Sequence, residues 1–302
     1  MNDDFMELLV CPKDEKHKLD LKAERNGAQA ISKGSIACSI CGKMFDIDEG
    51  ILRSIDVDKD ALSEIKVQEI ARRDLGYEKV KNYQLDLDRV AEYDAIKSAV
   101  GNCEGQWVLD AGCGVGQMTQ VFNGAVRGAG IDFSLTGLLN FNSKAVKKMD
   151  LIQGDVCRRY FREALFDTVI SAQVIEHIPT HEERLAFIFQ LSRAMKPSGL
   201  CVITVYNWDL SRKASGMPKE GLHNNGIFYH CYSESEFRSD LSRSFDVKAV
   251  WGVHNYLPKT FRLVNALGRQ MIYWDRLWRR NRISYDYGKL LLAICRSKAT
   301  TP

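Results

Sequence analysis

The second half of the chain alternates short apolar runs with stretches in which apolar residues recur every three or four positions. The apolar runs predict seven strands, at residues 107–112, 128–132, 149–155, 166–173, 199–206, 245–253 and 289–296. Strands separated by helical stretches are typical of βαβ units, in which helices cover a parallel sheet. We therefore predict an α/β domain at residues 105–302, with a helical insertion at residues 252–286 before its last strand.

The first hundred residues follow two other patterns. Residues 5–56 hold short apolar pieces separated by glycines, which predicts a small β ribbon as a module of its own at residues 1–57. Residues 58–104 are charged and poor in glycine, and their apolar residues have helical spacing. This second segment predicts a helical linker and lid region.

Composition narrows the class of protein further. The chain has 302 residues, a formal net charge of +3, and no run approaching the roughly 18 apolar residues that a membrane span needs. Its first residues are acidic, unlike the basic start of a secretory signal, and its nine cysteines are an odd number dispersed along the chain. We therefore expect a soluble, cytoplasmic protein with reduced cysteines. The net charge is too small to indicate a nucleic-acid ligand by itself.

A glycine-rich turn follows the first strand of the α/β domain, in Val108–Gly116. Closely spaced glycines let the backbone approach a ligand where a Cβ would collide, and we expect a helix to begin near Gln117. The dinucleotide pattern G-x-G-x-x-G needs a glycine where Gln117 stands, so the turn disfavours NAD. Asp110 ends the strand, and its carboxylate suits the ammonium group of a ligand better than a pyrophosphate.

Two more acids follow the next two predicted strands. Asp132 comes twenty residues after Gly112, where a carboxylate can accept both hydrogens of a ribose diol. Asp155 ends the following strand, where an acceptor can take the exocyclic amine of adenine. Together with Asp110, these acids describe a ligand with a cationic amino-acid end, a ribose and an adenine.

Five successive segments resemble, in order, the motifs of the class I S-adenosylmethionine-dependent methyltransferases, in the group that acts on small molecules. They are VLDAGCGVG, GIDFS, QGDV, FDTVISAQVIEHI and AMKPSGLCVITVY. The resemblance runs from Trp107 to Val205 and more weakly to Cys295. It implies a doubly wound, seven-stranded, mostly parallel sheet of strand order 3-2-1-4-5-7-6, with strand 7 antiparallel, beside the N-terminal β ribbon.

The same resemblance places S-adenosylmethionine against residues at the strand ends. These are Asp110, Gly112, Cys113, Gly114, Gly116, Gln117, Asp132, Phe133, Asp155, Val156 and Gln173.

Methyl transfer is an in-line displacement, so the protein must chiefly hold the acceptor near the methyl carbon and exclude water. A base helps when the acceptor is a hydroxyl, and His177 follows the fourth strand, where the family faces the methyl group. We therefore predict His177 as the catalytic base; the alternative is that it only orders its loop or packs against the cofactor. The segment Ser171–Val174 lacks the N/D-P-P-Y turn of the enzymes that methylate nucleobase amino groups.

A loop at residues 222–232 concentrates histidine and tyrosine before the sixth strand. Loops at this position border the acceptor pocket in such enzymes, which predicts a substrate lid. Ordinary loop packing and a metal site are the alternatives that we weigh against it. The predicted acceptor contacts are Glu176, Tyr206, His223, Tyr229 and His230.

The N-terminal ribbon holds a C-x2-C pair, Cys38 and Cys41, and half of another at Cys11, with Asp14 where a second cysteine is usual. The segment is similar to zinc-ribbon modules fused to some methyltransferases. The resemblance implies a zinc site made by Cys11, Asp14, Cys38 and Cys41, with His17 as an alternative fourth ligand. A ribbon that folds without metal remains the alternative.

The insertion is basic and aromatic. Residues 259–282 carry seven Lys and Arg against one acid, interleaved with aromatic residues. Such a helix suits an anionic membrane surface or RNA phosphates. We favour a third interpretation, in which a stripe of Leu263, Leu267, Trp274 and Leu277 packs on its own domain while the arginines face solvent.

The sequence therefore predicts methyl transfer from S-adenosylmethionine to an oxygen or nitrogen of a small molecule or lipid-linked metabolite. The alternative is a ribosomal or transfer RNA methyltransferase that uses the ribbon and the basic helix to contact RNA. A scaffold that keeps the fold without catalysis is disfavoured by the intact glycine turn. Acceptor identity and oligomeric state stay open, because acceptor pockets in this fold come from loops and insertions.

Overall fold

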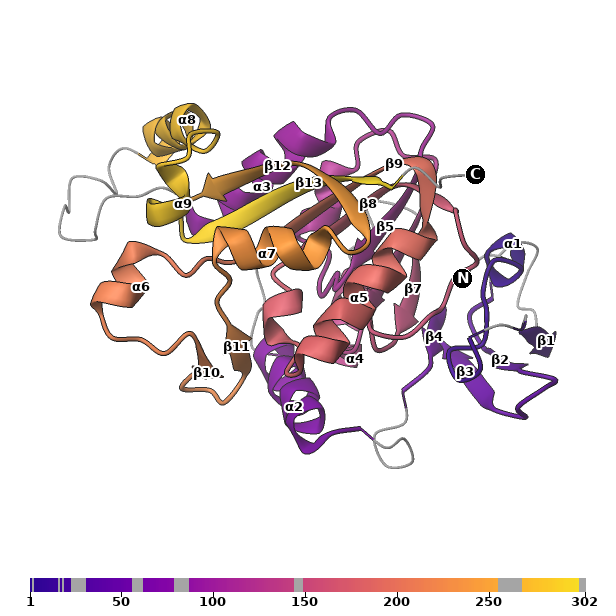
Figure 1. The fold of residues 1–302 in the computed structure, drawn as a ribbon. Helices are drawn as coiled ribbons and strands as arrows, with labels where there is room; N and C mark the ends of the chain where they lie inside the picture. The colour runs from indigo at the N-terminus through magenta and orange to yellow at the C-terminus, as the bar shows by residue number, and fades with distance from the viewer. Residues whose placement is uncertain are drawn as a thin grey trace.

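One mixed β-sheet runs through the computed structural model, which describes residues 1, 3–15, 17, 19–22, 31–55, 62–78, 87–143, 149–254 and 268–298 (Figure 1). In sheet order its strands are β1 (Asp20–Lys22), β2 (Gly34–Ala37), β3 (Met44–Asp48), β4 (Ile51–Arg53), β7 (Met149–Gln153), β6 (Arg127–Asp132), β5 (Trp107–Ala111), β8 (Phe166–Ala172), β9 (Met195–Tyr206), β13 (Leu290–Ser297) and β12 (Phe245–Val253). A separate hairpin pairs β10 (Glu220–Leu222) with β11 (Phe228–His230).

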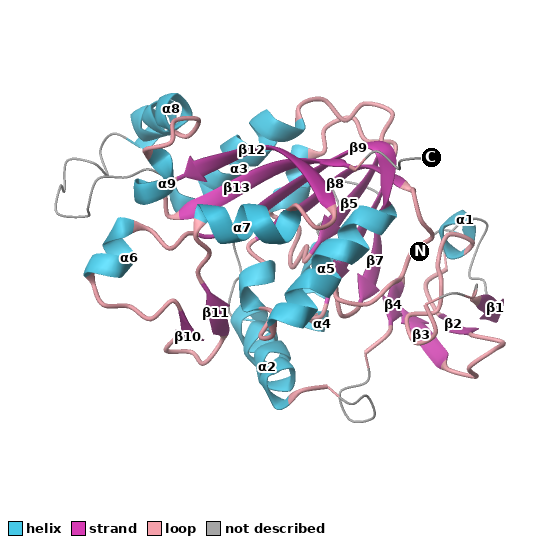
Figure 2. Ribbon diagram, viewed as in Figure 1, coloured by secondary structure: helices cyan, strands magenta, loops and turns pink. Residues whose placement is uncertain are grey.

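Helices cover both faces of this sheet (Figure 2). The described α-helices are α1 (Asp3–Met6), α2 (Glu64–Glu78), α3 (Leu87–Val100), α4 (Leu135–Ser143), α5 (His181–Ala194), α6 (Leu210–Ala214), α7 (Glu234–Leu241), α8 (Gly268–Trp278) and α9 (Ser284–Tyr287), and the 3₁₀-helices are η1 (Met118–Val121) and η2 (Ile175–His177).

The predicted order of the seven methyltransferase-type strands is confirmed. From β7 to β12 the strands follow 3-2-1-4-5-7-6, and β13 is antiparallel to both of its neighbours, pairing Leu292 with Thr204 on β9 and with Trp251 on β12. The parallel strands β5, β6 and β8 are buried along nearly their whole length, as expected for strands with helices on both faces.

Alternate residues of the strands serve two separate cores. On one face Leu109 of β5 belongs to the same apolar cluster as Phe187 of α5 and Phe237 of α7. On the other face Val108 clusters with Ile96 of α3. Because successive side chains of a strand point to opposite faces, this alternation gives each layer of helices its own core.

The predicted N-terminal β ribbon is present, and it extends the main sheet. Strands β1 to β4 are antiparallel to one another, and β4 then pairs in parallel with β7 over Ile51–Arg53. The backbone N–H of Val10 also donates to the carbonyl of Tyr160, at 2.9 Å. The ribbon is therefore bonded directly to the edge of the α/β sheet.

The helices differ from the sequence prediction at one point, the end of the glycine turn. The glycine turn leads into the 3₁₀-helix η1 instead of an α-helix, because the segment after Gln117 reaches Gly124, whose φ is +75°, within a few residues. The predicted linker contains the helices α2 and α3, and the insertion contains α8 and α9. Across the described residues, every helix is too short or too polar to span a bilayer.

Candidate cofactor and acceptor site

The turn after β5 can be built only with glycine at two positions. Gly112 has φ +83°, and a Cβ there would lie 2.1 Å from Cγ2 of Val174. Gly114 has φ +49°, and its Cβ would lie 2.6 Å from the hydroxyl of Tyr77. The backbone at the carboxyl end of β5 is therefore left bare, so that a ligand can approach it closely.

Asp110 lies beneath this turn and is 1% exposed. Burial raises the pKa of its carboxyl to about 7, although the Thr119 hydroxyl, 2.5 Å away, lowers it by donating a hydrogen bond. Because this pKa is close to neutral pH, a nearby cation would shift the carboxyl to its anionic form. Asp110 is thus suited to a ligand that brings an ammonium or sulfonium charge.

Asp132 ends β6 and is held by two backbone donors. Its Oδ2 accepts from the N–H of Gly114 at 2.8 Å, and its Oδ1 accepts from the N–H of Ser134 at 2.9 Å. Burial raises the pKa of this carboxyl, while both hydrogen bonds oppose the shift. Each carboxylate oxygen keeps a further lone pair, so the fixed group can accept both hydrogens of a diol.

Asp155, after β7, is paired with Lys66 of α2. The Lys66 ammonium lies 2.8 Å from Asp155 Oδ2 and 2.5 Å from Glu183 Oε1. Burial alone would raise the pKa of Asp155, but the charge of Lys66 outweighs it and the pKa is lowered. Asp155 is therefore an anion held by a cation that sequence reasoning did not single out.

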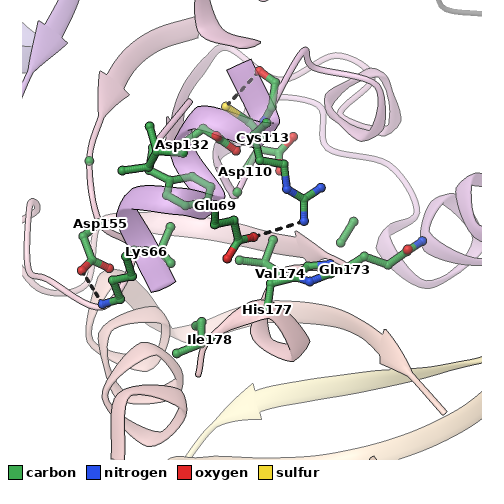
Figure 3. Close-up of a pocket in the computed structure, with 18 of the residues that line it drawn as sticks. Lys66, Glu69, Asp110, Cys113, Asp132, Asp155, Gln173, Val174, His177 and Ile178 are labelled. Atoms are coloured by element: carbon green, nitrogen blue, oxygen red, sulfur yellow. Dashed lines mark hydrogen bonds and ion pairs between the residues drawn. The ribbon is translucent and has the colours of Figure 1, made fainter. Parts of the chain in front are cut away.

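These acids and the glycine turn border one cavity (Figure 3). Ten of the eleven residues predicted to contact the cofactor line it: Asp110, Gly112, Cys113, Gly114, Gln117, Asp132, Phe133, Asp155, Val156 and Gln173. Gly116 does not line it, and a Cβ there would meet the ring of Phe141 at 2.7 Å, so Gly116 shapes the turn.

One face of α2, within the predicted lid region, borders the cavity, although the sequence did not single out its residues. Its lining residues Lys66, Glu69, Arg73 and Tyr77 recur every three or four positions. Arg73 donates to Glu69 at 3.3 Å, yet burial still raises the pKa of Glu69 to about 7. The helical spacing of these polar residues was the available signal.

Gln173 stands at the end of β8 in a left-handed conformation, with φ +56°. Its amide donates to Oε2 of Glu92, on α3, at 2.6 Å. Glu92 is fully buried and also accepts from the Thr204 hydroxyl at 2.5 Å and from Arg89 at 2.7 Å. Strain at a non-glycine residue, held by a buried network, is a common feature of ligand sites.

His177 ends η2 and lines the same cavity. Its Nδ1 lies 2.7 Å from the carbonyl oxygen of Phe228, which can only accept, so Nδ1 carries the hydrogen and Nε2 keeps a lone pair. Burial, assisted by the positive charge of Arg73, lowers the pKa of His177 well below its usual value. The ring is therefore neutral at physiological pH with the lone pair of Nε2 open, and burial makes it a weaker base than an imidazole in water.

None of the five predicted acceptor residues lines this cavity, and the structure divides them into three groups. Rings of Tyr206, His223 and Tyr229 form a cluster with His177, with centroids 4.6 to 5.9 Å apart between successive rings. His230 lies elsewhere, since its Nδ1 is 3.0 Å from Glu220 and its Nε2 is 2.8 Å from Glu236. The first group borders His177, whereas both ring nitrogens of His230 lie within hydrogen-bond distance of carboxylates.

Glu176 is fully buried beside His177 but does not line the cavity. Among the described residues its carboxyl oxygens have no hydrogen-bond partner. Burial raises the pKa of Glu176 to about 8, so the group is a neutral acid at pH 7.

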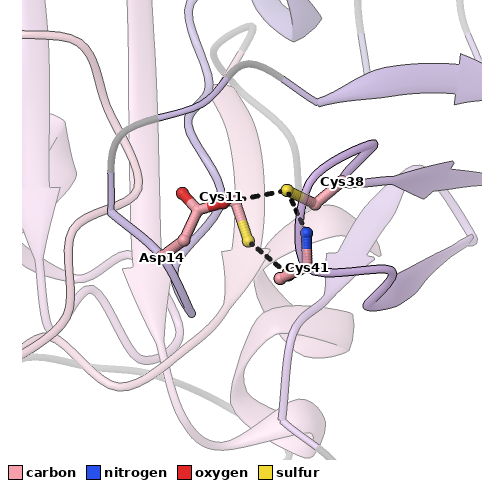
Figure 4. Close-up of side chains that lie close together, drawn as sticks. All are labelled: Cys11, Asp14, Cys38 and Cys41. Atoms are coloured by element: carbon pink, nitrogen blue, oxygen red, sulfur yellow. Dashed lines mark hydrogen bonds between the residues drawn. The ribbon is translucent and has the colours of Figure 1, made fainter.

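The four predicted zinc ligands come together in the ribbon (Figure 4). Cys11 Sγ lies 3.6 Å from Cys41 Sγ, Cys38 Sγ lies 3.0 Å from Asp14 Oδ2, and all four ligand atoms are within 4.8 Å of one another. Tetrahedral zinc with bonds of about 2.0–2.3 Å requires separations of this size. His17 donates its backbone N–H to Asp14 at 3.0 Å, so it orients the carboxylate.

Within the insertion, one sequence interpretation is wrong. Trp274 and Leu277, expected to pack on the domain, are exposed, whereas Asp275 and Arg279 are buried. The reason is that α8 is held to α3 by ion pairs, so its charged face points inward. Leu263 and Leu267 lie outside the described residues.

Residues 109–203 match the family described as a methyltransferase domain. A protein of Encephalitozoon cuniculi, provisionally named a methyltransferase, is 36% identical over 137 residues, which are 41% of this chain and 62% of that protein. A probable tRNA methyltransferase 9B of Mus musculus is 26% identical over 63% of this chain and 40% of its own length. A tRNA (carboxymethyluridine(34)-5-O)-methyltransferase of Arabidopsis thaliana is 33% identical over 34% of this chain and 24% of its own.

The chain thus spans between about a quarter and three-fifths of the length of these relatives. Among solved structures, the Burkholderia thailandensis 1,6-didemethyltoxoflavin-N1-methyltransferase is 16% identical with a TM-score of 0.54, over 86% of this chain and 97% of that one. A chain in the complex of the Haloferax volcanii Trm112 methyltransferase activator is 16% identical with a TM-score of 0.51, over 79% and 99%. These likenesses concern the fold.

Proposed function

Residues 109–203 are a methyltransferase domain with the class I fold, and on that basis we propose that the chain transfers a methyl group from S-adenosylmethionine to an oxygen or nitrogen acceptor. The observation that carries the proposal is the convergence of Asp110, Asp132 and Asp155 on one cavity beside a bare glycine turn. A cationic amino-acid end, a ribose diol and an adenine amine are the groups that these acids suit.

Bound S-adenosylmethionine would supply an activated methyl group on a sulfonium. The protein then has to hold the acceptor in line and exclude water. The α2 face borders the cavity that the proposed cofactor residues line. Gln173, directly after β8, and His177 line the same cavity. His177 Nε2 takes the proton of a hydroxyl or amine acceptor, while the bond from Nδ1 to Phe228 fixes the ring.

The acceptor that we favour is a small molecule or lipid-linked metabolite. A ring cluster of Tyr206, His223 and Tyr229 beside His177 suits a compact, partly apolar acceptor. Transfer RNA is the second candidate, because two of the relatives above are named as tRNA methyltransferases.

Transfer of labelled methyl groups distinguishes the two acceptors. Purified protein is incubated with labelled S-adenosylmethionine and, separately, with a metabolite and lipid extract or with total RNA. We expect label in the extract; label in RNA alone would replace the favoured acceptor by the second, and no transfer in either would contradict the proposal.

A His177→Ala variant tests the base. Its turnover is expected to fall by about 10²–10⁴-fold at unchanged cofactor affinity, the usual range for a lost general base. Tyr287→Phe, an exposed position on α9, is the matched control. Normal turnover of His177→Ala would show that His177 is not the catalytic base.

We also propose that the ribbon holds one zinc ion. Its four candidate ligand atoms already lie at the separations that tetrahedral zinc needs, and Asp14 is oriented by a second residue. Zinc content of the purified chain tests this.

A further inference from the structure

Helix α8 presents aromatic residues to solvent, whereas Asp275 within it and Arg279 just after it are buried against the protein. Asp275 and Arg279 are 1% and 3% exposed. The four large side chains of the opposite face are 60, 57, 56 and 45% exposed, and we call them the aromatic face: Tyr273, Trp274, Leu277 and Trp278. Helices on a protein surface usually have the reverse arrangement.

Ion pairs to α3 hold the helix in this orientation. Arg276 Nε and Arg279 Nη1 lie 2.9 and 3.0 Å from the same oxygen of Asp94. Arg279 also donates to the hydroxyl of Ser98 at 2.9 Å, and its guanidinium stacks 5.3 Å from the ring centre of Trp251. Rolling the helix to bury the aromatic face would break these contacts and expose Asp275.

The lowered pKa of Asp94 agrees with this arrangement. Burial alone would raise that pKa, and the hydrogen bonds from Arg276 and Arg279 outweigh the effect of burial. Asp94 is therefore an anion throughout the physiological range, and α8 stays pinned to α3.

The apolar surface continues beyond α8, and its rim is basic. Ile283 and Tyr287 are also exposed, and so are Arg280 and Arg282 between them and the aromatic face. Gly268–Tyr287 contains five arginines against two aspartates. In Figure 1 the helix lies at the periphery of the molecule, away from the ribbon.

We propose that the aromatic face of α8 binds an anionic lipid surface. Tryptophan and tyrosine favour the boundary between headgroups and acyl chains, and the rim arginines complement anionic headgroups. Leu277 and Ile283 can offer RNA neither a hydrogen bond nor a stacking ring, so the composition of the patch fits lipid better than RNA. The helix lies along the surface, since it is too short to cross a bilayer.

This inference is independent of methyl transfer, because the vesicle assay that tests it needs no cofactor. Full-length protein is sedimented with phosphatidylcholine vesicles, with and without phosphatidylglycerol. The wild-type chain is expected to bind only the anionic vesicles, and binding should weaken as salt is raised. A double variant, Trp274→Ala with Trp278→Ala, should lower partitioning by about tenfold or more.

Two further variants sharpen the assay. Replacing the rim arginines, Arg280→Glu with Arg282→Glu, should lower binding by about tenfold or more while leaving the aromatic face intact. Phe189→Ala, which removes an equally exposed aromatic ring from α5, is the matched control and should bind as the wild type does. Arg280 also stacks on Trp251, with its guanidinium 5.0 Å from the ring centre, so the melting temperature of every variant is measured alongside.

Three outcomes would overturn the proposal. The first is absence of wild-type binding to anionic vesicles, and the second is equal binding by the Trp274→Ala, Trp278→Ala variant. The third is a dimer in analytical ultracentrifugation, or an RNA complex in a gel shift, that the same double variant abolishes while vesicle binding persists.

Discussion

Buried carboxyls near the cavity take different charge states because their partners differ. Asp155 is an anion beside Lys66, Asp110 has a pKa near neutrality, and Glu176 is a neutral acid. Burial acts to raise the pKa of all three, and only Asp155, with Lys66 in direct contact, has its pKa lowered. Of these three, only Asp155 and Asp110 line the cavity, where a cationic ligand would contact them.

The neutral Glu176 makes a prediction about stability and pH. Its pKa is raised from 4.5 to about 8 in the folded chain, so the folded state binds more protons than the unfolded state between these values. The contribution of Glu176 to the free energy of unfolding is therefore fully present below pH 4.5 and is lost as the pH rises towards 8. Glu176→Gln should remove this loss and raise the free energy of unfolding at pH 8 by on the order of 1–3 kcal/mol.

Urea unfolding at pH 6 and pH 8 measures the effect. Glu104→Gln, which neutralises an exposed acid, is the matched control and should leave the pH dependence unchanged. Identical pH dependence in the wild type and Glu176→Gln would show that the carboxyl is ionised in the folded protein.

The three acids that line the cavity were predictable as single residues, and the ring cluster only in part. Asp110, Asp132 and Asp155 each follow an apolar run, and the carboxyl ends of parallel strands meet at one edge. His223 and His230 lie in the same histidine- and tyrosine-rich segment, yet the ring nitrogens of His230 contact Glu220 and Glu236. A loop sequence does not reveal which of its side chains find partners inside the loop.

At the scale of elements, the strands were predictable and the roles of the helices were not. Apolar runs marked the seven strands β5 to β9, β12 and β13, and the central ones are continuous because both of their faces are covered. The hairpin of β10 and β11 was expected as a loop. The contribution of α2 depends on where it lies over the sheet, which spacing alone does not determine. For α8, periodicity identified two faces but not which one is held inward, because that depends on Asp94 in another helix.

Ser54, directly after the ribbon strand β4, connects the ribbon to the segment that carries Asp155 through a short hydrogen-bond chain. The Ser54 hydroxyl lies 2.6 Å from the carbonyl of Gln153 and 2.9 Å from the hydroxyl of Tyr160. That tyrosine hydroxyl accepts the backbone N–H of Asp155 at 3.1 Å. Tyr160 therefore positions the loop that carries Asp155.

Tyr160→Phe removes this acceptor while keeping the buried ring. Cofactor affinity is expected to fall about three- to tenfold, the usual effect of one buried hydrogen bond. Titration calorimetry with S-adenosylmethionine measures it, with Tyr287→Phe as control. Unchanged affinity in a folded Tyr160→Phe protein would mean that Asp155 is held without the tyrosine.

At the scale of the whole molecule, one sheet joins the ribbon at one edge to the β12–β13 hairpin at the other. The central strands hold the residues of the cavity, the ribbon edge holds the candidate metal site, and α8 lies near the carboxyl end of β12 (Figure 1). Because the sheet is continuous, disturbance of the ribbon should reach β7 and the loop after it.

Zinc removal is expected to destabilise the chain. Chelation, or Cys38→Ser, should lower the melting temperature by on the order of 5 °C, since metal binding stabilises only the folded ribbon. Metal analysis should give one zinc per wild-type chain and less zinc in Cys38→Ser. Cys231 follows β11 and is not among the candidate ligands, so Cys231→Ser should keep its zinc. Full zinc content in Cys38→Ser would contradict the assigned ligands.

Direct binding of S-adenosylmethionine to the wild-type chain, measured by titration calorimetry beside Asp132→Ala, tests the central claim most directly. Asp132 accepts two backbone hydrogen bonds and faces the cavity, so its loss should weaken binding by about 10- to 100-fold. Asp246→Ala, an exposed acid on β12, should bind as the wild type does. Saturable 1:1 binding by the wild type, with that loss in Asp132→Ala, is the expected result; failure of the folded wild-type chain to bind, or equal affinity in Asp132→Ala, would contradict the account.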